Sequence, residues 1–447
     1  MNDSTTTLSP PSSHLPWRRN YWLGQAYSVC NQLGWFLTDP GLVLSVLIRT
    51  LGGSHFLVGL VPALRSVAFF LPQMLVAGRV QSHQYKRPVL LAAQAVRVVF
   101  YSSIAITLLL WAPHHPTLAL AAFFLLYVTT QFTGSIINVT RLDVLGKIIA
   151  PQSQSRFFAQ TQLWVGLIGL ASGVIVRFVL KNNQAVPAPA QFATLFFFSA
   201  VSFAVGGVVF WNIVEPPSKT SNQQSNSYQH WQLGPTIWRV DPNYRRLVLT
   251  RLVLGLTHVA TPFYAVYAVE ELGVSVSMVG LYLSLFTGAR LGATPLWDWI
   301  ARRRGTVIMW RIAVALAITV PIIAIGMPRI ISPQTPLASW LPSLYATVFL
   351  LNGASFTGRI IAIQSLELAV SPEPLRPIYI GFLNSLAGIA SLVPMLGGPI
   401  VEVAGYSMVF TISGCFAALA LIGTIGLEPR VCQDGWIKLQ AIVETTR

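Results

Sequence analysis

The chain has 447 residues, of which 53% are hydrophobic and only 10% charged, and its mean hydropathy is +0.61. Soluble globular proteins carry about 25% charged residues, so this composition excludes an ordinary soluble protein and indicates an integral membrane protein. The formal net charge is +15. The positions of the basic residues, given below, argue against nucleic-acid binding as the reason for this positive charge.

Apolar runs of about 20 residues, the length that crosses a bilayer as a helix, recur along the chain. They predict an all-α membrane protein with twelve transmembrane helices in two sets of six. The first set is Gln25–Ile48, Phe56–Ala77, Val89–Trp111, Leu118–Ile137, Phe158–Leu180 and Phe192–Ile213. The second set is Leu247–Val269, Met278–Ile300, Val307–Met327, Leu344–Ile363, Ile378–Ile400 and Met408–Leu427.

Polar segments divide the chain into five parts. We expect a disordered tail rich in Ser, Thr and Pro at 1–16, one six-helix bundle at 17–214 and a second at 246–428. Residues 215–245 are rich in Ser, Asn and Gln and lack an apolar period, which is typical of a linker. Residues 429–447 are expected to form a C-terminal tail.

Basic residues lie mainly in the connections on one side of the expected membrane. They include Lys147 and the run Arg302–Arg304, whereas only Arg49, Lys181 and Arg329 fall in loops on the other side. Because Lys and Arg favour the cytoplasmic side, both termini are expected in the cytoplasm. This distribution predicts a multi-pass protein of the cell membrane whose large partner is the lipid bilayer and not nucleic acid.

Polar side chains recur along the first span at steps of three or four residues, on one face of a helix: Gln25, Ser28, Gln32, Trp35 and Asp39. A polar face is unfavourable in lipid, so we expect it to line a cavity, with a contact to a neighbouring helix as the alternative. Pro40 and Gly41 follow directly and predict a helix break beside Asp39.

Charged residues inside the spans are mostly positive. Arg65 and Asp39 both lie roughly 15 Å from the same end of their spans, and the cost of an unpaired buried charge predicts an ion pair between them. Arg97 and Arg290 are further embedded cations, for which snorkelling or contact with a helix C-terminus is the alternative. This excess of positive charge suits a small anionic or amphiphilic molecule.

Two short connections carry paired bases. GRVQSHQYKRP follows the second span and TPLWDWIARRRG follows the eighth. Both resemble the loop signature Gly-x-x-x-Asp-Arg-x-Gly-Arg-Arg/Lys of the major facilitator superfamily, in which this loop takes part in gating. The resemblance implies gating roles for the matching residues Gly78, Lys86, Arg87, Asp298, Arg302 and Arg303. In the first loop Ser82 replaces the acid of the signature.

A decapeptide is repeated about half a chain apart. LGGSHFLVGL at Leu51–Leu60 recurs as LGVSVSMVGL at Leu272–Leu281, 221 residues later, with six identical positions. Two six-span halves related in this way resemble the parallel repeats of the same superfamily. At this offset Asp39-Pro40-Gly41 corresponds to Ala260-Thr261-Pro262, so a helix break is expected in both halves and an acid in one.

The resemblance further implies that spans one, four, seven and ten line a central cavity. In the second half the candidate cavity residues are His258 and Tyr264 of the seventh span and Asn352 and Arg359 of the tenth. A histidine titrates near neutral pH and is a candidate for proton exchange, although a structural hydrogen bond is the alternative for His258.

The leading hypothesis is a monomeric secondary active transporter of a small organic solute, which works by alternating access around a midplane site. Asp39 is the candidate for proton coupling. The alternative is a transport-incompetent relative that serves as a sensor or as an assembly partner of a membrane complex. Catalytic, metal and phosphate-binding motifs are missing from the sequence, so we expect neither an enzyme nor a cofactor nor a metal.

Overall fold

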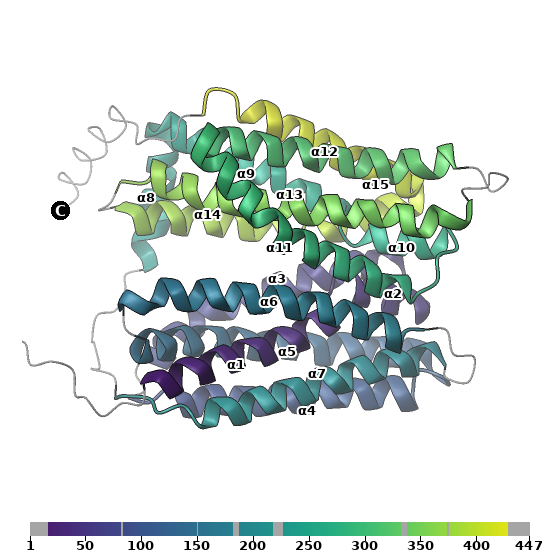
Figure 1. Cartoon of the computed structure of the whole chain (residues 1–447), viewed down its shortest axis with the longest axis horizontal. Helices are drawn as coiled ribbons and strands as arrows, with labels where there is room; N and C mark the ends of the chain where they lie inside the picture. The colour runs from purple at the N-terminus through teal and green to yellow at the C-terminus, as the bar shows by residue number, and fades with distance from the viewer. Residues whose placement is uncertain are drawn as a thin grey trace, which may run out of the picture.

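The computed structural model describes residues 17–81, 84–149, 151–181, 187–217, 227–331, 338–372 and 375–427, and every regular element in these ranges is helical. The first half contains α1 (Trp17–Leu37), α2 (Val43–Thr50), α3 (His55–Gln81), α4 (Arg87–Leu110), α5 (Pro116–Ile148), α6 (Pro151–Val179) and α7 (Ala188–Trp211). After α8 (Ser227–Val240), the second half contains α9 (Pro242–Leu256), η1 (Thr257–Ala260), α10 (Phe263–Glu270), α11 (Met278–Arg304), α12 (Thr306–Ile330), η2 (Ala338–Trp340), α13 (Leu341–Val370), α14 (Arg376–Ala390) and α15 (Pro394–Gly423). The two halves form adjacent helical bundles (Figure 1).

Eight helical segments of the described chain are long and apolar enough to cross a membrane. One of them, Ile378–Gly423, has 46 residues, more than twice the roughly 20 that one crossing needs. Gly405, with a φ of 77°, divides it within α15. It therefore contains two spans. The first consists of α14 and the part of α15 before Gly405, and the second is the part of α15 after Gly405. Together with the spans formed by α1–α2, α3 and α11, the predicted fold of twelve helices in two bundles is confirmed.

Both halves contain the predicted break in their first span. The first span stops at Leu37 and resumes as α2, and the seventh is interrupted by η1 and Pro262 before α10. The repeated decapeptide also has the same backbone in both copies. Gly52 and Gly273 have φ values of 76° and 63°, a region in which glycine is favoured, and each ends a short helix before a long one begins.

The repeat also lies where the two halves touch. A Cβ atom on Gly59 of α3 would lie 2.1 Å from the carbonyl oxygen of Pro394, at the start of α15. A Cβ atom on the equivalent Gly280 of α11 would lie 2.4 Å from the carbonyl oxygen of Gly173 in α6. Backbones approach this closely only where no side chain intervenes. Each copy of the repeat thus supplies the glycine that lets its half contact the other.

The outer surface is apolar, as expected for a protein in a bilayer. Large side chains such as Phe178 and Ile330 are 76% and 80% exposed. The segment 215–245, predicted as a linker, contains α8 and ends near the buried Asp241, whose carboxylate accepts the N–H groups of Asn243 and Tyr244 at the start of α9. Burial raises the pKa of the Asp241 carboxyl above its ordinary value. The predicted tails, 1–16 and 429–447, lie outside the described residues.

Candidate functional site

A cavity of about 370 Å³ lies within the first half, between side chains of α1, α3, α4, α5 and α6. Ser28, Gln32 and Trp35 of the polar face of α1 line it. Gln25 of the same face does not, because its Nε2 donates to the carbonyl oxygen of Phe157 at 2.8 Å and holds α1 against α6. The polar face of α1 therefore combines both expected roles, lining a cavity over most of its length and contacting a helix at one end.

Three arginines from three helices line this cavity: Arg65 of α3, Arg97 of α4 and Arg141 of α5. The guanidinium carbon of Arg65 lies 4.7 Å from the centre of the Trp35 ring, and that of Arg97 lies 5.8 Å from the same ring. The indole face attracts a cation without cancelling its charge. Trp35 thus holds two positive groups at one wall of the cavity.

Amide oxygens supply the hydrogen bonds of the deeper guanidinium groups. Nη2 of Arg97 donates to Oδ1 of Asn31 at 2.5 Å and to Oε1 of Gln94 at 2.7 Å, and the side chain is 1% exposed. Nη2 of Arg141 donates to Oδ1 of Asn138 at 3.3 Å. Arg141 was not predicted as a cavity residue because the apolar run of the fourth span ends at Ile137, whereas α5 continues to Ile148.

The expected ion pair between Asp39 and Arg65 is not formed. Oδ1 of Asp39 instead accepts the N–H groups of Gly41 at 3.0 Å and Leu42 at 2.9 Å, where the break leaves these donors without helical partners. Within the described ranges, no Lys or Arg nitrogen lies within 4 Å of this carboxylate. Asp39 does lie within electrostatic range of both Arg65 and Arg290.

Arg290 belongs to α11 of the second half. Its guanidinium carbon lies 4.9 Å from the centre of the Phe356 ring and 5.7 Å from that of Phe286, so aromatic faces surround this cation as well. The carboxylate at the break is therefore influenced by one arginine of the first half and one of the second.

The other candidate residues of the second half do not line the first-half cavity. His258 lies in η1, and the ring of Tyr264 stacks on Phe410 with 4.6 Å between ring centres. Both interact electrostatically with Arg359 of α13, whose side chain is 7% exposed. Asn352 lies two helical turns away on α13. Three of the four candidates thus form one electrostatically coupled group inside the second half, in which Tyr264 and Arg359 are buried and His258 is partly exposed.

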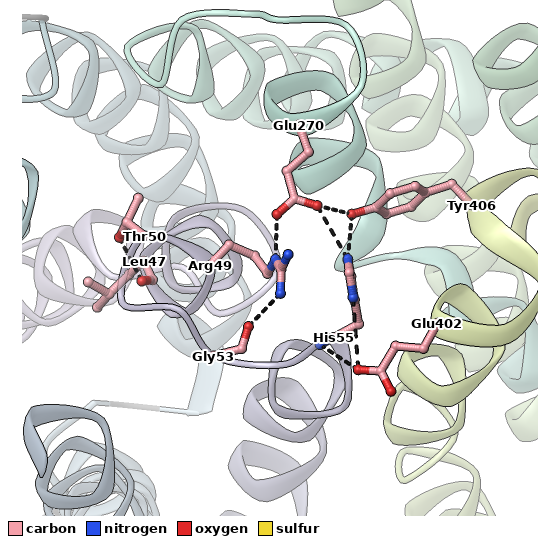
Figure 2. A network of polar contacts seen from close by, with 8 residues as sticks. All are labelled: Leu47, Arg49, Thr50, Gly53, His55, Glu270, Glu402 and Tyr406. Carbon is pink, nitrogen blue, oxygen red and sulfur yellow. Dashed lines mark hydrogen bonds and ion pairs between the residues drawn. The ribbon is translucent and has the colours of Figure 1, made fainter. Parts of the chain in front are cut away.

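A polar network joins the halves at one end of the molecule, which we term the Glu270 end (Figure 2). One carboxylate oxygen of Glu270, from α10, pairs with Nε of Arg49, and the other accepts the hydroxyl of Tyr406. Nε2 of His55 lies 3.3 Å from Glu270 and 2.8 Å from the Tyr406 hydroxyl. The backbone N–H of His55 donates to the Glu402 carboxylate at 3.2 Å. Two residues of the first half thus bind three of the second.

This network was not predicted, although the sequence contained a signal for it. Arg49 and Glu270 are separated by 221 residues, the offset of the repeat. Equivalent residues of two repeats meet when they lie next to the axis that relates the repeats. An acid and a base at equivalent positions near a repeat boundary are therefore candidates for a pair across the two halves.

The first gating loop is bound at the opposite end, which we term the α8 end. Nζ of Lys86 lies 2.8 Å from Asp143 of α5, and the backbone N–H groups of Lys86 and Arg87 donate to the Glu215 carboxylate at 2.9 and 2.7 Å. Nζ of Lys147 contacts both acids, at 2.8 and 2.9 Å. Asp143 and Glu215 thus provide the negative charge that this loop sequence lacks. Ser82 lies outside the described residues, and Gly78 is part of α3.

The charged side chains of the second gating loop contact other residues of the same loop. Among the described residues, no ion pair or cation–ring contact links them to another part of the chain. Asp298 and Arg302 form a pair at 2.7 Å, with side chains 54% and 73% exposed, and Arg303 lies over Trp299 at 4.8 Å. Glu367 of α13 pairs with Arg251 of α9 at the same end of this half. The two loops, similar in sequence, are therefore held differently.

Comparison with known proteins agrees with this architecture. The family model described as Major Facilitator Superfamily matches residues 26–393. No curated protein matches the chain in sequence.

Among solved structures, a mutant of the nucleoside transporter NupG is 15% identical, covers 91% of this chain and 99% of its own, and gives a TM-score of 0.68. A bacterial homologue of the iron transporter ferroportin in an inward-facing state is 14% identical, with coverages of 93% and 99% and a TM-score of 0.66. In an outward-facing state with soaked iron, a bacterial homologue of that transporter is 16% identical, with coverages of 92% and 99% and a TM-score of 0.55.

The family match spans more than four fifths of the chain, and the similar structures cover more than nine tenths of it. Their agreement with the twelve-helix fold and its internal repeat leads to one conclusion. The chain is a multi-pass membrane protein that belongs to the major facilitator superfamily.

Proposed function

We propose that this protein is a secondary active transporter that moves a small organic solute through the first-half cavity by alternating access. The observation that supports it is the combination of a polar cavity of about 370 Å³ with a network of charged and polar side chains that joins the two halves at the Glu270 end. Alternating access requires a solute cavity and, beside it, a contact between the two halves that can break and form again.

The state described is, in this proposal, the inward-facing one. The α8 end carries many of the basic connections, which favours its placement in the cytoplasm, and the Glu270 end then faces outward. The higher TM-score with an inward-facing than with an outward-facing ferroportin homologue, 0.66 against 0.55, supports the same assignment. Residues 215–245 would link the two halves on the cytoplasmic side.

Asp39 is the proposed coupling residue. It lies at the helix break, within electrostatic range of Arg65 in one half and Arg290 in the other, so a proton on its carboxylate would change the attraction between the halves. Its second role, accepting two backbone N–H groups, can be separated from its charge. Asn retains a capping oxygen, whereas Ala retains neither the charge nor the cap.

Transport by purified protein in proteoliposomes tests both proposals. We expect uptake of at least one member of a metabolite panel, stimulated by a pH gradient in the wild type and insensitive to it in Asp39→Asn. Asp39→Ala should also lower the stability of the fold, by about 1 kcal/mol. Unchanged pH dependence in Asp39→Asn would exclude the coupling role. Absence of uptake and of ligand-induced stabilisation across the panel would favour the accessory-protein alternative.

A further inference from the structure

We propose that the first-half cavity is an anion site, in which Arg65, Arg97 and Arg141 bind an oxyanion group of the solute, a carboxylate, sulfonate or phosphate. This assignment rests on the proposed transport function for its biological meaning, but not for its physical basis. It names the class of solute and three residues that recognise it.

The first observation is that three cations face one space without an acid among its lining residues. The arginines come from α3, α4 and α5, so their convergence is a property of the fold and not of one helix. All other side chains that line the cavity are neutral. Asp39, which interacts electrostatically with Arg65, is not among the lining residues, and its Oδ1 is already bound by two backbone N–H groups.

The second observation is the kind of contact that each guanidinium makes. Arg65 lies against the face of Trp35, Arg97 donates to two amide oxygens, and Arg141 donates to one. These partners orient the groups but carry no formal charge, so the positive charge of the cavity is not cancelled. Nε of Arg97 is buried and has no hydrogen-bond partner in the described chain.

A buried charge without a counter-ion is costly inside a membrane. A bound oxyanion reduces that cost, and the planar guanidinium group matches it with two parallel N–H donors. Arg97 is 1% exposed and fixed by Asn31 and Gln94, so it supplies mainly a constant field. Arg65 and Arg141, each partly exposed, are the groups free to form direct hydrogen bonds.

Thiol labelling measures the sign of the cavity without knowledge of the solute. After Cys30, Cys415 and Cys432 are replaced by Ser in the full chain, Ser66→Cys places a thiol in the cavity wall. Its labelling rates are compared for the anionic 2-sulfonatoethyl and the cationic 2-(trimethylammonio)ethyl methanethiosulfonates. Asn212→Cys, at the exposed end of α7, is the matched control. Because Arg19 binds the Asn212 carbonyl, this control already includes a neighbouring cation.

We expect the anionic-to-cationic rate ratio at Ser66→Cys to exceed that at Asn212→Cys by at least about tenfold, since a charged cleft concentrates its counter-ion. Arg65→Gln and Arg141→Gln should each lower the ratio. Equal ratios at the two positions would overturn the proposal. Failure of both reagents to react at Ser66→Cys would also overturn it, because a solute site must admit small ions.

A second measurement tests binding directly. Benzoate, benzenesulfonate and phenylphosphonate should raise the melting temperature of the wild type, and their order distinguishes the three oxyanions. Benzamide and benzyltrimethylammonium should not raise it, and stabilisation by these two alone would contradict an anion site. A high anionic-to-cationic labelling ratio at Ser66→Cys without uptake of any solute would contradict the transport proposal only. Uptake of neutral solutes together with equal labelling ratios at Ser66→Cys and Asn212→Cys would support transport and contradict the anion site.

Discussion

The charged residues of this protein fall into two groups, those that meet an opposite charge and those that do not. Pairs form at the two ends of the molecule, for example between Lys147 and Glu215. In the middle, Arg65 and Arg97 meet rings and amides, and Asp39 meets backbone N–H groups. Ion pairs thus occur at the ends, while the positive charges that line the cavity have no acid among the other lining residues.

The sequence identified which charges lie deep but not their partners. Depth is predicted by counting residues along an apolar run, and this count placed Arg65 and Arg97 within spans that the structure forms as α3 and α4, and Asp39 at the break between α1 and α2. The partner depends on where a side chain points, which the local backbone decides. At Asp39 the helix stops, so unpaired N–H groups of Gly41 and Leu42 compete with a distant arginine and bind the carboxylate first.

Glu215 should be the acid whose loss most weakens the α8 end. Its side chain is 2% exposed and accepts N–H groups of Lys86, Arg87 and Lys147. Glu215→Gln removes the negative charge that these three donors face, while Lys147 keeps its pair with Asp143, so we expect the change to lower stability by about 2 kcal/mol. The measurement is the shift of the unfolding transition of the purified protein.

The matched control for this change is Asp298→Asn. The Asp298–Arg302 pair lies on one helix with side chains 54% and 73% exposed, and such pairs contribute less than about 1 kcal/mol. Similar destabilisation by both substitutions would show that the Glu215 contacts are no stronger than a solvated pair.

At the scale of helices, hydrophobic runs predicted where spans lie, and the breaks at Pro40 and Pro262 followed from the residues themselves. The ends of helices were less predictable. The fourth span extends eleven residues past its apolar run, to Ile148, because Asp143 and Lys147 at its polar end pair with each other and with neighbouring residues. Polar helical turns of this kind leave no trace in a hydropathy profile, and Arg141 was missed for that reason.

Glycines set how closely α3 approaches α15. A Cβ atom on Gly59 would lie 2.1 Å from a backbone oxygen of Pro394, so Gly59→Ala must separate the two helices. We expect this change to shift the protein toward the state that is open at the Glu270 end. Spin labels at Ser54 and Ser275, exposed and equivalent in the two repeats, should report longer distances by double electron–electron resonance.

Gly326→Ala in α12 is the control for this experiment. A Cβ atom at Gly326 meets nothing within 4 Å, and alanine is favoured over glycine in a helix. The label distances should therefore stay at the wild-type values in this variant. Wild-type distances in Gly59→Ala would mean that the close approach of α3 and α15 does not limit opening.

The whole molecule is two related bundles whose contact depends on a few residues near the axis between them. At the Glu270 end, the carboxylate of Glu270 contacts Arg49 and His55 of the first half and Tyr406 of the second half (Figure 2). Because several contacts share Glu270, losing this side chain removes them together.

Glu270→Gln should favour the open state by about 1.4 kcal/mol, a tenfold change in the ratio of closed to open molecules. Arg49→Gln should have a smaller effect of the same sign, because it leaves the His55 and Tyr406 contacts in place. The distances between labels at Ser54 and Ser275 measure both populations. The double variant should show less than the sum of the two effects, since the substitutions remove one shared pair. Strict additivity would contradict a direct interaction.

The pairing of Arg49 with Glu270 has a consequence for the ancestry of the fold. In a dimer of two identical six-helix chains, equivalent positions carry the same residue, so two arginines or two glutamates would meet at the axis and repel each other. Complementary charges at this point require that the two copies have diverged from each other at this position. A chimera built from two first halves should therefore fail to close at this end, and a second half with Glu270→Arg should behave in the same way toward its natural first half.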